Sequence, residues 1–575
     1  MSDTTLEGVS RRGFLAMTSS VVGLGLTAGW AENTSTIDLS LMKTTTHETD
    51  VLVIGGGMAG LFAAVKAHDA GASVMMVAKG RLGSSGLTPF AKGFFVYDPD
   101  TAELSLDEYT AKVSRSALGT NNPVYTRQTA EHSQARAKEL EEWGFFNSNL
   151  YNASFTTPIA ARGIPVIERV TITHLIKDGD RIAGAAGFRI DAEEIVSFTA
   201  KSVILCTGAG AFKPNGFPVN DLTHDGTIMA YKIGAKVTGK EWNDGHSAQA
   251  TNAAATYDGW GDMFDQKPST VGVEVRHDLG MDMNYTAYMT GNPVQGGPGS
   301  PVQMEVPAGG PYRPAEFAEG AGRSGPPGGE GDGGGEGDHK GPPPGMARVP
   351  VGGASAGMAI HKSEGLVPVN DRCASNIAGL FAAGDALGSY MAGGIYTQIG
   401  SSLSGSAVQG AIAGEASAEY AKSAARPSVT AKEMARIEAE ILAPLKRAAG
   451  YSPAWVTQTL QGIMIPNFVL YIKKETMLRA ALAYVEELRD HHMPMLRAAD
   501  LHELRLAHET ANMIVSAEMK LRASLMRTES RCSHYRLDYP EVDDVNWRAW
   551  INISQGANGE MMLEKQPFDD WPRQG

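Results

Sequence analysis

The stretch DVLVIGGGMAGLFAAVKAHDAGASVMMVAK (Asp50–Lys79) decides the fold of this chain. An apolar strand, DVLVI, runs directly into a GxGxxG pattern formed by Gly55, Gly57 and Gly60, and a helix and a second strand, VMMV, follow. Gly55 permits a tight turn, Gly57 lets the backbone approach a pyrophosphate, and Gly60 lets the helix pack closely on the strand. In this strand–turn–helix context the pattern predicts an α/β, Rossmann-like dinucleotide-binding domain, with the helix N-terminus facing the phosphates.

The second strand of this unit ends in Ala78 and Lys79, where an acidic residue would usually bind a ribose. The missing acid argues against a nicotinamide cofactor, but it is compatible with FAD if other segments hold the adenosine. We predict that Ala78 and Lys79 contact the cofactor, together with Met58 and Ala59 in the first turn of the helix.

The composition narrows the class of function. The 575 residues are enough for two or three domains, and the formal net charge of -14 argues against nucleic acid as a partner. The three cysteines, Cys206, Cys373 and Cys532, lie far apart and form no CxxC or CxxCH motif, which argues against an internal iron–sulfur cluster or c-type haem. We expect the cysteines to be buried without forming disulfides, and we predict no metal site.

The N-terminus has the pattern of an export signal. SRRGFLAM (Ser10–Met17) contains a twin arginine followed by bulky apolar residues, and a modest apolar run ends in small residues near Ala31. This arrangement predicts a twin-arginine signal peptide and a periplasmic or extracytoplasmic location. The run is too short and too rich in glycine for a membrane span, so we expect no integral membrane segment. Because the twin-arginine route carries folded proteins, the signal also agrees with a bound cofactor.

Six further stretches carry motifs along the chain: SSGLTPFAKGFF (Ser84–Phe95), CTGAG (Cys206–Gly210), THDGTIMAYKIGA (Thr223–Ala235), GLFAAGD (Gly379–Asp385), GSSLSGSAVQG (Gly400–Gly410) and RTESRCSHYRLDYPEVDD (Arg527–Asp544). With the glycine motif, they resemble the flavoprotein subunits of fumarate reductase, succinate dehydrogenase and L-aspartate oxidase. They are also similar, more distantly, to the adenylylsulfate reductase alpha subunit. The resemblance covers nearly all of the chain after the signal and is weakest between residues 251 and 349.

The resemblance implies an FAD-dependent oxidoreductase with a Rossmann-like FAD-binding domain, an inserted cap domain and a C-terminal helical domain. The boundaries that follow are a signal at 1–31, a first FAD-binding segment at 48–240, a cap or substrate domain at 241–349 with a disordered Gly/Pro-rich loop at 292–345, a second FAD-binding segment at 350–427, a helical domain at 428–540 and a C-terminal tail at 541–575. The loop is expected to be disordered because its composition cannot bury enough apolar area. Residues 430–526 show apolar side chains at helical spacing.

The same resemblance implies that FAD is held by residues of the later motifs: Ser85, Gly86, Thr88, Lys92, Gly93, Thr207, Gly208, Asp225, Asp385, Ser402 and Leu403. Asp385 stands where the family has an acid that binds the ribityl chain. A helix that begins near Ser402 would direct its free N–H groups at the flavin. Leu87 replaces the histidine that carries the flavin covalently in membrane-bound members, which implies non-covalent FAD.

Two departures from the family concern the substrate. Just before G-N-S-L the family has H-G-A-N-R, whose His and Arg bind a dicarboxylate, but the chain has GGIYT, with Gly393 and Thr397 at those places. The family's cap-domain motif that includes G-E-G-G and the proton-donating Arg has no convincing copy either, since GGEGDGGGEG lies in the Gly/Pro-rich loop. We therefore expect neither fumarate nor succinate to be the substrate.

Three residues remain as candidates for substrate chemistry. His246, in EWNDGH, matches a substrate-facing His and could donate a hydrogen bond or a proton, although a structural role is the alternative. Tyr396 could donate a proton, stack on an aromatic substrate or pack in the core. Arg531, like His534, matches the C-terminal motif; we expect both mainly to hold the helical domain against the FAD domain, with direct substrate contact the lesser alternative. His361 matches a second family His only loosely and is more easily explained as a loop residue.

These observations predict an exported, FAD-dependent reductase that transfers a hydride from flavin N5 to an activated C=C bond of a small organic, non-dicarboxylate substrate. Without a haem or cluster motif, the electrons must come from a separate redox partner, such as a cytochrome, a quinone-linked protein or an iron–sulfur protein. One alternative is an exported dehydrogenase that passes electrons to a quinone or a cytochrome. Another is a non-catalytic flavin electron-transfer subunit. A role like that of adenylylsulfate reductase is disfavoured, because that enzyme works in the cytoplasm.

Overall fold

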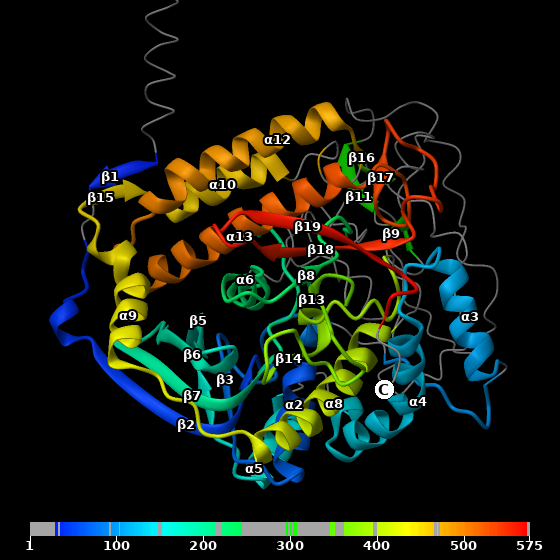
Figure 1. Cartoon of the computed structure of the whole chain (residues 1–575), viewed down its shortest axis with the longest axis horizontal. Helices are drawn as coiled ribbons and strands as arrows, with labels where there is room; N and C mark the ends of the chain where they lie inside the picture. The colour runs from blue at the N-terminus through cyan, green and yellow to red at the C-terminus, as the bar shows by residue number, and fades with distance from the viewer. Residues whose placement is uncertain are drawn as a thin grey trace, which may run out of the picture.

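The computed structural model describes residues 29–32, 35–90, 94–102, 104–147, 152–213, 221–243, 295–296, 300–301, 303–307, 346–350, 362–394, 400–464, 469 and 472–571. The chain is built around a seven-stranded sheet, with a group of helices and a small four-stranded sheet on one side of it (Figure 1). The strands and helices of the first half are β2 Lys43–Ile54, α2 Met58–Asp69, β3 Val74–Ala78, α3 Leu106–Ser116, α4 Pro123–Glu142, α5 Asn152–Ala161, β4 Val166–Glu168, β5 Val170–Asp178, β6 Arg181–Arg189, β7 Glu194–Leu205, α6 Asp225–Lys232 and β8 Val237–Thr238.

Two long parallel strands, β2 and β7, form the centre of the large sheet, whose order is β4-β3-β2-β7-β6-β5. β14 (Leu380–Ala382) pairs with the end of β7 in parallel, so the second predicted FAD-binding segment completes the sheet begun by the first. In the strand DVLVI, the four residues after Asp50 are apolar and buried because the strand is covered on both faces, as parallel sheets usually are. The predicted strand–helix–strand unit and the α/β fold class are confirmed.

α8 (Ser401–Ser423) lies against α2 on this sheet (Figure 1). The small residues of α8 permit the close approach: a Cβ at Gly410 would be 2.3 Å from the carbonyl oxygen of Ala59, and a Cβ at Gly414 would be 2.5 Å from that of Ala63. Glycine at positions 410 and 414 is therefore a packing requirement of the two helices.

The helices that follow residue 428 are α9 Ala431–Lys446, α10 Pro453–Met464, α12 Glu475–Glu487 and α13 Leu501–Met526, with short strands β15 Ala449–Tyr451, β16 Ile472–Lys473 and β17 Tyr535–Arg536. α10, α12 and α13 pack on one another through an apolar core, and Figure 1 shows them together above α6. α9 runs down beside the large sheet and packs on β6. α13 therefore connects the helical group to the FAD-binding half, through its contacts with α6.

The predicted C-terminal tail at 541–575 is wrong, because much of it forms a hairpin. β18 (Ala549–Gln555) and β19 (Met561–Pro567) pair antiparallel, and β18 also pairs with β8 in a four-stranded sheet of order β13-β8-β18-β19, with β13 at Gly365–Leu366. Trp550 is buried and donates its indole N–H to the carbonyl of Thr120 at 2.8 Å. The alternation Ile551-Asn552-Ile553-Ser554 in β18 and the turn residues GANG at 556–559 favour the hairpin.

Some of the segment predicted to be a disordered loop also differs from expectation. β9 (Gln295–Gly296) pairs with β10 (Ser300–Pro301), and β11 (Gln303–Pro307) pairs with β12 (Met346–Pro350). The rest of residues 292–345, most of the predicted cap domain and the first 28 residues of the predicted signal lie outside the described residues. At the end of the predicted signal, β1 (Trp30–Glu32) pairs with β15.

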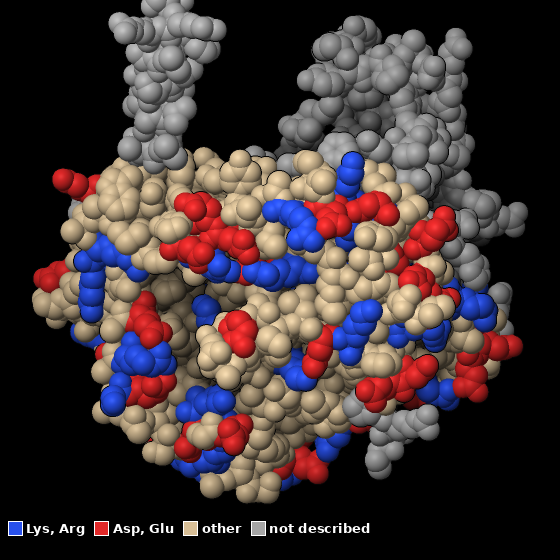
Figure 2. Space-filling model, turned by 45° about the horizontal axis from the view of Figure 1, so that its top comes forward, with Lys and Arg blue, Asp and Glu red and all other residues tan. Residues whose placement is uncertain are grey.

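The three cysteines are buried and free, as expected. Burial raises the pKa of the Cys373 and Cys532 thiols to about 12, so both stay protonated at neutral pH. Acidic and basic side chains lie interspersed on the face shown in Figure 2. Within the described part of the chain, no helix has both the length and the apolar character that crossing a bilayer requires.

Candidate functional site

The glycine motif forms a tight turn between β2 and α2. Gly55 has a φ of +118°, and a Cβ there would lie 2.1 Å from the carbonyl oxygen of Cys206. A Cβ at Gly60 would lie 1.9 Å from the carbonyl oxygen of Gly55, so only glycine lets α2 start this close to the strand. The Met58 N–H, in the first turn of α2, donates to the hydroxyl of Thr88 at 3.1 Å. This hydrogen bond places the loop of the second motif beside the helix N-terminus.

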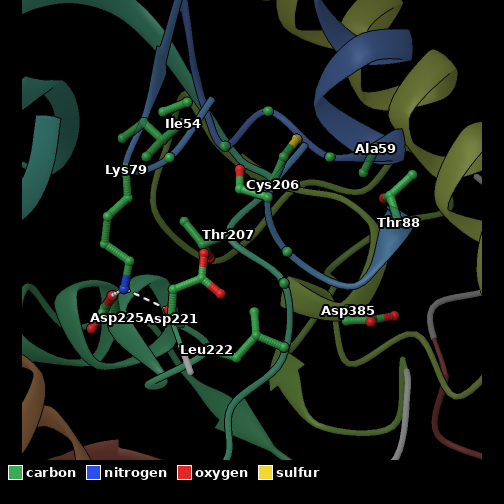
Figure 3. Close-up of a pocket in the computed structure, with 18 of the residues that line it drawn as sticks. Ile54, Ala59, Lys79, Thr88, Cys206, Thr207, Asp221, Leu222, Asp225 and Asp385 are labelled. Carbon is green, nitrogen blue, oxygen red and sulfur yellow. Dashed lines mark hydrogen bonds and ion pairs between the residues drawn. The ribbon is translucent and has the colours of Figure 1, made fainter. Parts of the chain in front are cut away.

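A cavity opens beside this turn, at the carboxyl ends of β2, β3 and β7 (Figure 3). Thirteen of the predicted cofactor-binding residues line it: Gly55, Gly57, Met58, Ala59, Ala78, Lys79, Ser85, Gly86, Thr88, Thr207, Gly208, Asp225 and Asp385. The carboxyl edge of the parallel strands is where nucleotide ligands bind in open α/β sheets. The structure thus brings together segments that the sequence predicted separately.

The cavity fits FAD on two observations. The turn at Gly57 has open space on its cavity side, since a Cβ there would come no nearer than 3.3 Å to Thr88 Oγ1. The Thr207 hydroxyl is buried at the wall without a protein hydrogen-bond partner, as a group reserved for a ligand would be. Leu87 also lines the cavity and offers no atom for a covalent flavin link.

Three predicted cofactor-binding residues lie elsewhere, and two fall outside the described residues. Gly60 packs the helix on the turn and does not line the cavity, as its predicted role requires. Ser402 and Leu403 belong to the first turn of α8, which begins one residue earlier than the predicted start at Ser402. Neither of them lines the cavity, whereas Ser406, one turn further along α8, does. Lys92 and Gly93 lie outside the described residues.

Lys79 is held at one side of the cavity by two carboxylates. Its ammonium lies 2.8 Å from Asp225 and 2.8 Å from Glu509, and it also donates to the carbonyl of Asp221 at 2.5 Å. Burial alone would lower the pKa of Lys79, but Asp225 and Glu509 raise it above its ordinary value. Lys79 is therefore charged, and Glu509 of α13, which the sequence did not suggest, ties the helical group to the cavity wall.

A second group that the sequence analysis missed is the tripeptide Lys362-Ser363-Glu364. Lys362 Nζ lies 2.7 Å from Asp385 Oδ1 and 2.7 Å from the carbonyl oxygen of Ser402. The Ser363 hydroxyl donates to the carbonyl of Gly393. The three side chains are buried, and each contacts a different region of the molecule. The tripeptide therefore links the Asp385 side of the cavity to the turn at Gly393.

Glu364, the third member, lies among buried cations. Its carboxylate is 2.6 Å from Lys240 and 3.0 Å from Lys520. The same carboxylate accepts a hydrogen bond from His224 Nδ1 at 2.9 Å. Burial alone would raise the pKa of Glu364, but the two lysines hold this pKa well below its usual range. Burial lowers the pKa of His224 to about 4, so this imidazole is neutral at pH 7.

The structure assigns Arg531 a structural role. Its guanidinium binds Glu529 and Asp544 at 2.8 Å each and donates to the carbonyl of Leu118 at 2.7 Å. These contacts occupy the guanidinium and tie the C-terminal motif to the loop before α4, which agrees with the structural role expected for Arg531 and disfavours the lesser alternative, direct substrate contact. His534 is likewise buried between Lys473 and the carbonyl of Arg527. His246, Tyr396 and His361 lie outside the described residues.

The remaining cavity residues are ones that the sequence analysis did not name as ligands: Ile54, Gly56, Val77, Gly80, Leu87, Val170, Ile172, Cys206, Asp221, Leu222, Met229, Ala383 and Ser406. Most of them neighbour a named motif, so widening each motif by one or two residues would have found them. Val170 and Ile172 belong to β5, which reaches the cavity through the antiparallel region of the sheet and has no local signal.

Comparison with known proteins agrees with this site. Residues 50–214 match the family described as FAD dependent oxidoreductase, and residues 457–572 match the family described as fumarate reductase flavoprotein C-term. The chain is 25% identical over 571 residues to an FAD-dependent oxidoreductase of Methanocaldococcus jannaschii, covering 91% of this chain and 98% of that protein. It is also 25% identical over 578 residues to a Methanothermobacter marburgensis protein named as a subunit of fumarate reductase (CoM/CoB), covering 89% and 98%.

Two solved structures share the fold over most of their length. A structure of adenosine-5-phosphosulfate reductase in complex with sulfite has a TM-score of 0.69 at 21% identity and covers 93% of this chain and 98% of its own. The E. coli quinol fumarate reductase flavoprotein has a TM-score of 0.69 at 18% identity and covers 92% and 97%. From the cavity, the two family matches and the full-length relatives together, the chain is an FAD-dependent oxidoreductase that carries a fumarate reductase flavoprotein C-terminal domain.

Proposed function

We propose that this protein is a reductase that uses FAD to deliver a hydride to an activated C=C bond of a small organic substrate other than a dicarboxylate. The observation that carries the proposal is the turn at Gly393, where relatives in the family keep a substrate-binding His. FAD supplies the hydride chemistry when it is bound. The chain supplies the cavity that holds FAD, the charges around it and the shape of the space offered to the substrate.

The surroundings of Gly393 leave no room for that His. The residue has a φ of +79°, and a Cβ there would lie 2.4 Å from the Cβ of Ala117 and 2.7 Å from Thr120 Oγ1. The next residue, Gly394, is equally confined, since a Cβ would lie 2.9 Å from the ring of Trp242. The packing of this turn therefore excludes a His side chain at position 393. This exclusion supports a substrate that needs no carboxylate-binding side chain there.

His246 and Tyr396 remain the proposed proton donors. The described residues nearest to them lie close together: Asn243 N–H donates to the hydroxyl of Ser533 at 3.2 Å, and that hydroxyl donates to the carbonyl of Gly394 at 2.7 Å. His246 is three residues from Asn243, and Tyr396 is two from Gly394. Such short connections reach at most about 11 Å, which supports a role for both residues in one site.

The relative from M. marburgensis is named a fumarate reductase subunit, so fumarate is the substrate that a test must exclude first. Protein reduced with a viologen dye would be supplied with fumarate, unsaturated monocarboxylates, aromatic propenoates and enones, and dye oxidation would be followed. We expect one of the non-dicarboxylates to oxidise the dye at least tenfold faster than fumarate. Turnover of fumarate as fast as that of the best other compound would contradict the proposal.

The electron donor and the location complete the proposal. We propose that a separate redox partner supplies the electrons, and that the twin-arginine motif directs the folded protein to the periplasm. Fractionation of cells that produce the chain, compared with a variant in which Arg11 and Arg12 are replaced by lysine, tests the location. We expect the unaltered chain outside the cytoplasm and the variant inside it; the same distribution for both would refute export by this route.

A further inference from the structure

Lys362 is a buried cation at the Asp385 side of the FAD cavity. Its side chain is 1% exposed, and its ammonium lies 2.7 Å from Asp385 Oδ1, whose residue lines the cavity. The same ammonium lies 2.7 Å from the carbonyl oxygen of Ser402, in the first turn of α8. Lys362 therefore joins a cavity carboxylate to the N-terminal turn of the helix.

The surrounding chain holds this lysine in a defined conformation. Lys362 has a φ of +63°, a left-handed backbone that is unfavourable for a side-chain-bearing residue. Its carbonyl accepts the N–H of Tyr390 at 2.6 Å. Gly405 of α8 leaves space for its methylene stem, because a Cβ there would lie 2.8 Å from Lys362 Cε. A conformation this constrained indicates a function for the amine at its end.

The charge of Lys362 lies at the end of the helix where a cation is least favourable. The N-terminus of a helix carries a partial positive charge, and α8 has no acidic residue in its first turn. Asp385 neutralises one unit, so the ammonium and the helix end together leave a net positive potential beside the cavity. A positive potential stabilises an anion, and reduced FAD carries more negative charge than oxidised FAD. The potential beside the cavity therefore favours the reduced cofactor.

We infer that Lys362 and Asp385 form a charge pair that sets the reduction potential of the bound flavin, with Lys362 favouring the reduced cofactor and Asp385 opposing it. The inference rests on FAD binding and is independent of the substrate. It deepens the role of Asp385, because the carboxylate acts on the cofactor's charge in addition to holding it. Lys362 acts as a positioning and charge-setting residue.

The midpoint potential of the bound flavin tests the pair without any substrate. It would be measured by reference-dye titration of the holoprotein at saturating FAD, for Lys362→Met, Asp385→Asn and the double variant. We expect Lys362→Met to weaken reduced FAD relative to oxidised FAD by about tenfold, which for a two-electron couple is about 30 mV to lower potential. We expect Asp385→Asn to shift the potential in the opposite direction, and the double variant to lie near the original value.

Controls separate this role from mere support of the fold. Lys362→Arg keeps the charge and should leave the potential close to the original, and Lys362→Gln carries the expectation of Lys362→Met if that variant does not fold. Lys432→Met removes an exposed lysine of α9 that does not line the cavity, and it should change the potential little. Shifts of the same sign for both single variants, or no shift for the lysine variants, would overturn the inference. Neither result would bear on which substrate the enzyme reduces.

Discussion

Gly57 and Gly60 belong to one motif but are required for different reasons. A Cβ at Gly57 would meet only the Thr88 hydroxyl, at 3.3 Å, and the backbone there is extended. A Cβ at Gly60 would run into a backbone oxygen at 1.9 Å. Glycine at position 57 therefore leaves space for a ligand, and glycine at position 60 lets the helix pack closely on the strand.

This distinction predicts opposite phenotypes for two alanine variants. Gly57→Ala should change the free energy of unfolding of the apoprotein by less than about 1 kcal/mol but weaken FAD binding at least tenfold. Gly60→Ala should destabilise the apoprotein itself by about 2–3 kcal/mol, because the backbone must move. Denaturant titration of both apoproteins and quenching of FAD fluorescence would measure the two effects. Equal loss of stability in both variants would show that Gly57 also serves packing.

The helices α2 and α8 approach so closely that α8 needs glycine at the two positions, Gly410 and Gly414, that face the backbone of α2. Gly414→Ala would place a Cβ 2.5 Å from the carbonyl oxygen of Ala63, and we expect a loss of about 2 kcal/mol in the free energy of unfolding. Gly462→Ala is the matched control: it lies in α10, and nothing approaches its Cβ position within 4 Å. That variant should stabilise the protein by about 0.5–1 kcal/mol, since alanine favours the helix. Thermal denaturation of both would reveal the opposite signs.

The sequence motifs predicted those elements whose geometry depends only on residues close together in the chain. The turn at Gly55, the strand before Asp385 and the start of α8 near Ser402 each follow from a few neighbouring residues, and all three were confirmed. Ile172 reaches the cavity only because β5 pairs antiparallel to β6, which no local pattern specifies. Glu509 meets Lys79 across 430 residues of chain. The C-terminal hairpin is different, because the alternation at 551–554 and the turn residues GANG at 556–559 are local signals that favour it.

At the scale of the whole molecule, charges are buried where segments distant in the chain meet. Lys79 and Glu509 join β3 to α13, and Arg527 joins the C-terminal motif to Glu241 at 2.9 Å in a fully buried pair. Such pairs add little net stability, but the loss of one partner leaves a buried charge uncompensated. They therefore fix which surfaces meet, and the cavity depends on that assembly because Lys79 is one of its walls.

A partly buried histidine of α13 gives this assembly a pH dependence. Burial lowers the pKa of His508, in α13, to about 4, although its hydrogen bond to the carbonyl of Ile441 and the charge of Asp225 oppose the shift, while His174 and Lys232 reinforce it. The unfolded chain takes up a proton near pH 6.5, whereas the folded protein stays neutral at this position down to about pH 4. The contribution of His508 to the free energy of unfolding is therefore fully present above pH 6.5 and is lost as the pH falls toward 4.

We expect His508→Gln, which can still donate to the Ile441 carbonyl, to remove some of this dependence. Between pH 7 and pH 4.5 the free energy of unfolding of the unaltered protein should fall by about 2 kcal/mol more than that of the variant. Urea titrations at a series of pH values measure the difference. His491→Gln is the control, because this side chain is 67% exposed, and it should leave the slope unchanged. If the His508 variant and the unaltered protein lose stability in parallel down to pH 4.5, then His508 is already protonated in the folded state, and α13 must open to water in that range.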